Sequence, residues 1–162
     1  DRVVFADGGV GVGVVLAVNR DTITGFTVAN DIIVLDTVQT TAATAAAATP
    51  VVQAVSAAGA LLLASATADI TVLNFDMGGV TAVLAGVLDG AALLANIGGA
   101  VTAGAGNADD GYILAYDNGT AYLYAYTDAV SAGVTAANIA LIGTFSNVAV
   151  NTIGVANFAL EA

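Results

Sequence analysis

Negative charge that the chain itself cannot neutralise is the feature that most constrains this fold. The sequence has twelve aspartates and one glutamate against two arginines, with no lysine or histidine, so its formal charge at pH 7 is -11. Ion pairs within the chain cannot balance this charge, and counter-ions must come from elsewhere. The remaining residues are mostly Ala, Gly, Val and Thr. The core must therefore be built from many small side chains packed closely.

Calcium is the counter-ion that the acidic residues favour. They are almost all aspartates, with asparagines interleaved, and these short side chains carry the hard oxygen ligands that calcium takes in loops. The alternative interpretation is that the charge only keeps an apolar protein in solution. We expect Ca²⁺ as the cofactor and keep the second interpretation open.

The missing residue types exclude several functional classes. Without His or Cys there is no imidazole base, thiol nucleophile, disulfide or ordinary zinc or haem site. With Arg2 and Arg20 as the only cations, nucleic acid and anionic membrane surfaces are poor partners. Residues 37–68 and 129–160 carry no charge, but Pro50, glycines and polar residues interrupt them, so we expect no transmembrane segment.

A single domain is expected from 162 residues. The fold class we predict is mainly β, an antiparallel β-sandwich or β-roll-like domain with one or two short helices. Four regions are expected along the chain: a strand region over 1–36, an Ala/Thr/Val-rich middle over 37–88, a short helix over 89–99, and a Tyr-rich hairpin with C-terminal strands over 107–162.

Local signals predict individual elements. Strands are expected at residues 2–5, with residues 22–28 and 32–35 forming a strand pair and residues 70–75 and 80–84 forming a hairpin. Asp89 is suited to cap a helix over 90–97 that ends at Gly98, and Thr135 to cap a single helical turn. Residues 51–66 are compatible with strands or with a buried helix.

The dipeptide Asn118-Gly119 between two alternating runs predicts a type I′ hairpin. The two-residue loop places Asp117 opposite Thr120 and Ala115 opposite Tyr122. All five tyrosines of the chain then lie in this hairpin. They could form a platform for stacking a ligand, but cross-strand aromatic packing is the interpretation we favour.

The same register suggests where a metal could bind. It puts Asp110 opposite Thr127 and Asp109 opposite Asp128, so three carboxylates gather at the open end of the hairpin. Their repulsion would be relieved by a divalent cation. Candidate metal ligands are therefore Asp109, Asp110 and Asp128, with Asp21, Asp31 and Asp7 as a second group. The alternative is that these aspartates only stabilise turns.

Two short motifs, DTITGF at residues 21–26 and NDIIVL at residues 30–35, carry a resemblance to a known family. They resemble the Asp-x-Ile-x-x-Phe and Asp-x-Ile-x-Leu pattern found just after the calcium β-roll of RTX, or haemolysin-type calcium-binding, secreted proteins. Residues 1–5 resemble the last strand leading out of such a roll, and residues 112–126, 140–143 and 155–160 are similar to the hairpin, short strand and terminal Phe-containing segment that close these proteins. The resemblance implies type I secretion and calcium-driven folding outside the cell. The calcium nonapeptide is absent, since Gly13 stands where it has aspartate.

Two functions fit these observations. One is a non-enzymatic extracellular structural protein that self-assembles into a filament, sheath or surface layer, because high mean hydropathy suggests apolar surface that needs a partner. The other is a calcium-binding C-terminal secretion and folding module of a larger exported toxin, adhesin or hydrolase. The partners expected are further copies of the chain, with cell-surface glycans left open. An enzyme is disfavoured, because adjacent strand residues such as Asp109 and Asp110 point to opposite faces.

Overall fold

The chain folds into a mainly β structure, as predicted. The computed structural model describes residues 1–5, 21–36, 50–63, 69–103, 111–126 and 134–161. The strands in these residues are β1 (Arg2–Phe5), β2 (Asp21–Ile23), β3 (Ile32–Asp36), β4 (Val52–Val55), β5 (Leu61–Leu63), β6 (Ile70–Asp76), β7 (Val101–Ala103), β8 (Gly111–Asp117), β9 (Thr120–Tyr126), β10 (Ile139–Ser146) and β11 (Phe158–Glu161). The helical elements are α1 (Ala91–Ile97), η2 (Ala136–Asn138) and η3 (Val155–Asn157).

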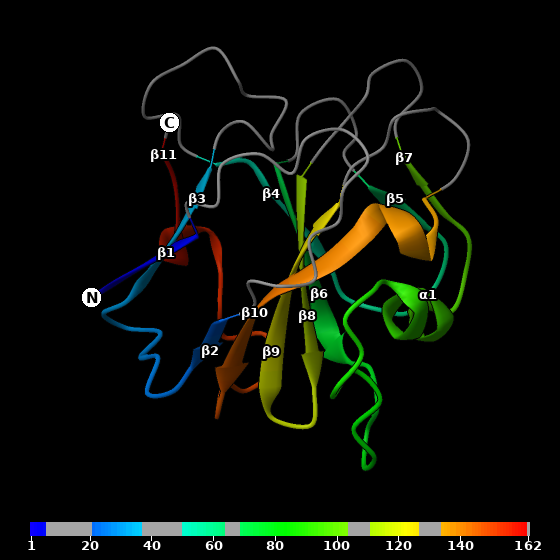
Figure 1. The fold of residues 1–162 in the computed structure, drawn as a ribbon, viewed down its shortest axis with the longest axis horizontal. Coiled ribbons are helices and arrows are strands. Elements are labelled where there is room, and N and C mark those ends of the chain that lie inside the picture. Colours follow the sequence, from blue (N-terminus) through cyan, green and yellow to red (C-terminus); the bar gives the residue numbers. More distant parts are fainter. Residues whose placement is uncertain (6–20, 37–49, 64–68, 104–110, 127–133, 162) are drawn as a thin grey trace.

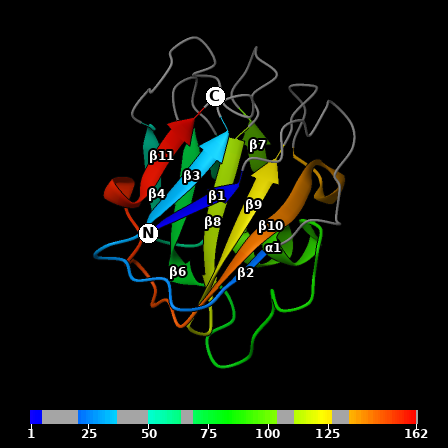
Figure 2. The same cartoon turned by 60° about the vertical axis from the view of Figure 1, so that its left-hand side comes forward.

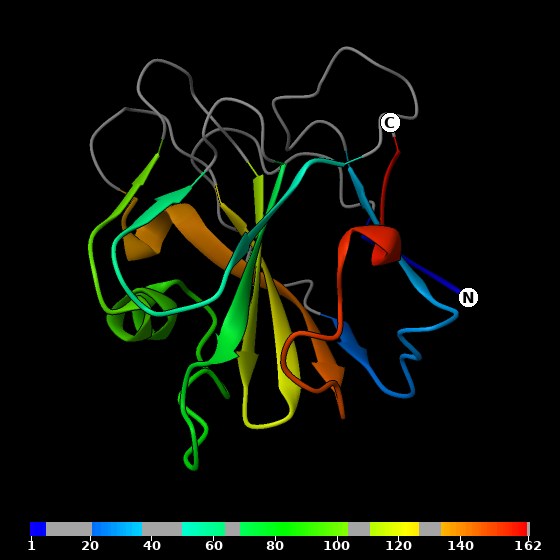
Figure 3. The same cartoon turned by 180° about the vertical axis from the view of Figure 1, so that it is seen from behind.

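The strands form layers around one large sheet. Six strands make this sheet in the order β2-β10-β9-β8-β6-β4, a second sheet has the order β1-β3-β11, and β5 pairs with β7. Figure 2 shows the three-stranded sheet in front of the large one, and Figure 1 shows α1 on the other side. From behind, β5 and β7 lie close to α1 (Figure 3). The Gly59 N–H donates to the Ile97 carbonyl at 2.7 Å, which ties that region to the helix end.

Most strand pairs are parallel, which differs from the antiparallel arrangement expected. Only β8 with β9 and β9 with β10 run antiparallel among the eight strand pairs of the described residues. Parallel neighbours need long crossover connections. The connection from β4 to β6, over residues 56–69, is of this kind. Residues 51–66, left open between strand and helix, contain β4 and β5.

The hairpin of β8 and β9 follows the predicted register. Asp117 pairs with Thr120, Ala115 with Tyr122, and Ile113 with Tyr124. Asn118 and Gly119 have φ of 49° and 76°, which are the positive values that a type I′ turn requires. The prediction of this hairpin and of its register is confirmed.

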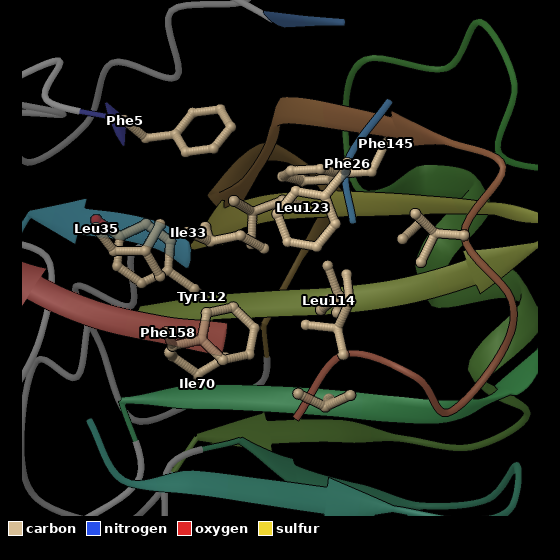
Figure 4. Close-up of a cluster of buried hydrophobic side chains, with 14 of the residues drawn as sticks. Phe5, Phe26, Ile33, Leu35, Ile70, Tyr112, Leu114, Leu123, Phe145 and Phe158 are labelled. Atoms are coloured by element: carbon tan, nitrogen blue, oxygen red, sulfur yellow. The ribbon is translucent and has the colours of Figure 1, made fainter. Parts of the chain in front are cut away.

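Each face of the large sheet covers its own core. On the face toward α1, Tyr122, Tyr124 and Tyr126 pack with Leu93 and Ile97. On the other face, side chains of the hairpin meet the three-stranded sheet, as Figure 4 shows. The residues labelled there include Phe5, Ile33, Leu35, Phe158, Tyr112, Leu114 and Leu123. The apolar material is thus divided between two thin layers, which suits a chain built of small side chains.

Two of the three predicted helix caps, Gly98 and Thr135, are borne out, and the third, Asp89, is shifted by one residue. Gly98 ends α1 in the left-handed conformation at φ 82°, and the Thr135 N–H donates to the Asn138 Oδ1 at 3.0 Å at the start of η2. Asp89 lies one residue before the N-cap, Gly90. Its Oδ1 still accepts the Ala91 N–H at 3.0 Å, so it satisfies a free amide of the first turn.

Two predicted strand pairs are wrong. β2 and β3 do not pair, because β2 joins β10 in the large sheet while β3 lies between β1 and β11. Residues 80–84 form no strand opposite β6. The Val83 and Leu84 N–H groups are instead bound by the Asp117 carboxylate, so they are unavailable to a strand ladder.

No helix in the described part of the chain has the length and apolar character needed to cross a membrane.

Candidate functional site

The first predicted metal site lies at the edge of what the structure describes. The β8–β9 register continues to Gly111 opposite Tyr126, one residue short of the predicted pair of Asp110 and Thr127. Asp109, Asp110 and Asp128 lie outside the described residues, as does Asp7. Calcium binding by these four aspartates stays a prediction.

The two remaining predicted ligands lie at the starts of strands that belong to different sheets. Asp21 is exposed at the start of β2, and Asp31 directly precedes β3. The Asp31 carboxylate accepts hydrogen bonds from the N-terminal ammonium at 2.8 Å and from the Thr27 N–H at 2.6 Å. These bonds, first the ammonium and then the amide, lower the pKa of Asp31. In this structure Asp31 therefore acts as a turn residue, and no group of three His, Cys, Asp or Glu side chains forms within the described ranges.

A different pair of carboxylates holds the turn end of the hairpin. The Asp76 Oδ1 accepts three backbone N–H groups, from Gly78 at 3.2 Å, Gly79 at 3.1 Å and Asn118 at 3.2 Å. The Asp117 Oδ2 accepts the N–H groups of Val83 and Leu84, both at 2.6 Å. Together they bind the segment after β6 to the β8–β9 turn, beside which it lies in Figures 1 and 3.

The second oxygen of Asp117 is in an unusual environment. Asp117 is 1% exposed, and its Oδ1 is buried with no hydrogen-bond partner. It faces Gly78: a Cβ on that glycine would lie 2.4 Å from the Asp117 Oδ1 and 2.1 Å from the Thr81 carbonyl oxygen. Both oxygens thus lie close to the Gly78 Cα, where only a glycine leaves room for them. A buried acceptor without a hydrogen-bond partner costs free energy of folding.

The tyrosines pack inside the protein and do not form a surface platform. All five are at most 6% exposed. Their partners on the neighbouring strands are aliphatic or small residues, such as Ala115 opposite Tyr122 and Ile113 opposite Tyr124, so the expected pairing of aromatic rings across the strands is not what buries them. Burial raises the pKa of Tyr116, Tyr122 and Tyr124, and the Asp117 charge adds to this effect at Tyr122 and Tyr124. The Tyr124 hydroxyl is buried without a hydrogen-bond partner, whereas the Tyr116 hydroxyl accepts the Ile153 N–H at 3.0 Å.

Removing these two hydroxyls should have opposite effects. Tyr124→Phe takes away an unsatisfied polar group, so we expect the free energy of unfolding to stay level or rise by up to about 1 kcal/mol. Tyr116→Phe leaves the buried Ile153 N–H without its acceptor, and we expect a loss of about 1–2 kcal/mol. Urea unfolding followed by circular dichroism measures both. Equal losses in the two variants would contradict the hydrogen-bond assignment.

Comparison of the chain with protein-family models, with curated proteins and with solved structures found no match. A functional proposal must therefore depend on the chemistry and geometry of the chain itself.

Proposed function

We propose that this chain is a non-enzymatic extracellular structural protein whose copies associate into a filament, sheath or surface layer stabilised by calcium. The observation that carries the proposal is the three-stranded sheet, in which β1 and β11 flank β3 and all three strands are parallel. Within the described residues, β3 is the one strand partner of each outer strand. Such edges are natural sites for strand addition.

The edge of β1 offers hydrogen-bonding groups. Successive residues of a strand direct their backbone N–H and C=O groups to opposite neighbours. The Ile32 N–H donates to the Asp1 carbonyl at 2.9 Å, so Asp1, Val3 and Phe5 face β3. Arg2 and Val4 therefore present their backbone groups to the open side. Val4 is also 49% exposed, so its side chain is available to a neighbour.

The two edges match in direction and in charge. Because β1 and β11 are parallel, β1 of one copy can extend the sheet beside β11 of the next in a head-to-tail contact, which repeats into an open assembly. Arg2 lies on β1 and Glu161 on β11, and within one copy they form an ion pair that reaches across β3. Both side chains are about half exposed, at 53% and 52%, so either can be shared with another copy.

Calcium enters the proposal through the charge of the whole chain. Copies with a formal charge of -11 repel one another, and a divalent cation lowers that repulsion. Assembly should therefore be favoured by calcium and reversed by a chelator.

Val4→Pro tests the edge directly. Proline removes an N–H that faces away from β3, so we expect the monomer to fold while head-to-tail association is lost. Val4→Thr is the matched control, because it keeps the β-branched shape and the N–H. Electron microscopy and sedimentation, each with calcium and after chelation, should find ordered assemblies for the natural chain and for Val4→Thr, and single particles for Val4→Pro.

Two outcomes would contradict this function. If the natural chain stays monodisperse in calcium, the self-assembling protein is excluded and the calcium-binding module of a larger exported protein becomes the better account. If Val4→Pro assembles as well as Val4→Thr, association does not use the β1 edge.

A further inference from the structure

We propose that Asn118 is a site of spontaneous modification, at which the side-chain amide becomes a carboxylate through a cyclic imide formed with Gly119. Water is the co-reactant and ammonia is released, so the reaction needs neither an enzyme nor a cofactor. It takes place within one chain and does not depend on the proposed assembly. The product carries a further negative charge at the turn of the β8–β9 hairpin, next to Asp117 and to the Asp76 carboxylate that binds the Asn118 N–H.

The reaction joins two neighbouring groups of the turn. The Gly119 amide nitrogen loses its proton to the solvent and attacks the Asn118 Cγ, so that a new C–N bond closes a ring. The bond between Cγ and Nδ2 then breaks, and that nitrogen leaves as ammonia. Water opens the ring at either of its carbonyl carbons. Opening at Cγ gives aspartate, whereas opening at the backbone carbonyl gives isoaspartate, in which the main chain runs through the former side chain.

The attacking nitrogen and its target are both unbound. Asn118 and Gly119 are exposed. Within the part of the chain that the structure describes, neither the Gly119 N–H nor the Asn118 side-chain amide makes a hydrogen bond. A Cβ on Gly119 would meet no heavy atom within 4 Å, so the turn has open space around the forming ring.

Few bonds oppose the motion that ring closure needs. The peptide between Asn118 and Gly119 must rotate out of its type I′ geometry, and glycine permits this rotation at little cost. The Asp76 Oδ1 accepts the Asn118 N–H at 3.2 Å, and the Val148 N–H donates to the Gly119 carbonyl at 3.0 Å. Opening these bonds leaves the pairing of β8 with β9 intact, so the turn can open while the packed strands stay folded.

Two other asparagines share the backbone conformation of Asn118 but lack a following glycine. Asn147 and Asn151 both have φ of 60°, and both are exposed. The residues after them are Val148 and Thr152, whose branched Cβ atoms crowd the amide nitrogen that would attack. The Val148 N–H is also bound to a carbonyl of the hairpin turn. Of these three asparagines, Asn118 is therefore the one whose neighbouring nitrogen is both unhindered and unbound.

The products weaken the attachment of the segment after β6 to the turn. A carboxylate at position 118 lies next to Asp117 and Asp76, and the chain has no lysine or histidine to offset the added repulsion. Isoaspartate also lengthens the main chain by one atom, which does not fit a two-residue type I′ turn. Both changes favour opening of residues 78–84, which these two aspartates bind through backbone N–H groups.

Peptide mass spectrometry of the folded natural chain, aged in mildly alkaline buffer, tests the site. Brief digestion with chymotrypsin can release residues 117–122 by cleavage after Tyr116 and Tyr122. An unaged sample gives the background from digestion. We expect this peptide to gain the mass that distinguishes an acid from an amide and to separate into two products of equal mass. Electron-transfer fragmentation then identifies the isoaspartate product.

The other asparagines in the same samples are the internal control. We expect conversion of Asn118 to be faster than that of Asn147 or Asn151 by about tenfold or more, because of the branched residues that follow them. Equal rates at the three positions would overturn the proposal. Conversion of Asn118 only in urea would overturn it as well, because the folded hairpin would then protect the amide.

Asn118→Asp measures the effect of the aspartate product on the fold. We expect a lower Tm than that of the natural chain and faster hydrogen exchange in residues 78–84. Asn151→Asp makes the same change in the same backbone conformation and should leave exchange in residues 78–84 unchanged. If Asn118→Asp matches the natural chain in both measurements, the inferred loosening of the turn is overturned.

Discussion

Replacing Phe145 with alanine is expected to lower the free energy of unfolding by about 3–5 kcal/mol. Phe145 lies on β10 and is fully buried. Its ring meets the edge of Phe26 at a centroid distance of 5.1 Å and that of Phe5 at 6.0 Å. Phe5 belongs to β1 of the three-stranded sheet, so the three rings join the two sheets. Truncation would leave a cavity between layers that small side chains cannot refill.

Urea unfolding followed by circular dichroism measures this loss. Phe145→Leu is the matched control, since it keeps most of the buried volume and should cost about 1–2 kcal/mol. Val155→Ala, at a side chain 53% exposed, should change stability by less than about 0.5 kcal/mol. A cost below about 1 kcal/mol for Phe145→Ala would mean that the sheets do not pack on this ring.

The parts of the fold that could be predicted from the sequence are those that depend on neighbouring residues alone. A type I′ turn needs positive φ at two adjacent residues, and Asn118-Gly119 meets that need wherever the strands later pack. Because successive strand residues point to opposite faces, the turn also determines which side chains of the two strands lie on each face of the hairpin. Gly98 at the end of α1 and Thr135 before η2 were predictable for the same reason, because a cap depends on residues within one turn of itself.

Strand partners were not predictable in this way. A turn motif in the sequence predicts where the chain reverses, but it does not predict which strands become neighbours in a sheet. Residues 77–79 do form a turn held by Asp76, yet the chain after it leaves the sheet, and β6 pairs in parallel with β8 from more than thirty residues later. Parallel pairing over such separations has no local signature.

The proximity of Asp76 and Asp117 was unpredictable for the same reason. The sequence predicts a turn at Asn118-Gly119, next to Asp117, and a separate turn between residues 75 and 80, which contains Asp76. What joins them is the pairing of β6 with β8, which brings Asp76 opposite Tyr116. The sequence does contain the required residue types, but their meeting depends on a tertiary contact. The acid excess of the sequence therefore did not indicate these two positions.

Asp117→Ala is expected to lower the free energy of unfolding by about 2–4 kcal/mol in the presence of a chelator. The change leaves the Val83 and Leu84 N–H groups without an acceptor, and each such loss costs about 1–3 kcal/mol. Part of this is offset because a buried carboxylate, with its unpaired Oδ1, is also removed. The two amides outweigh that gain because both bonds are short, at 2.6 Å, and made to a charged acceptor.

Two controls isolate the amide bonds in this measurement. Asp117→Asn keeps an acceptor for both N–H groups, so without calcium it should lose less stability than Asp117→Ala. Asp21→Ala, at an exposed carboxylate, should stay within about 0.5 kcal/mol of the natural chain. If the alanine and asparagine variants at position 117 are equally stable, Asp117 does not hold residues 83–84 to the hairpin.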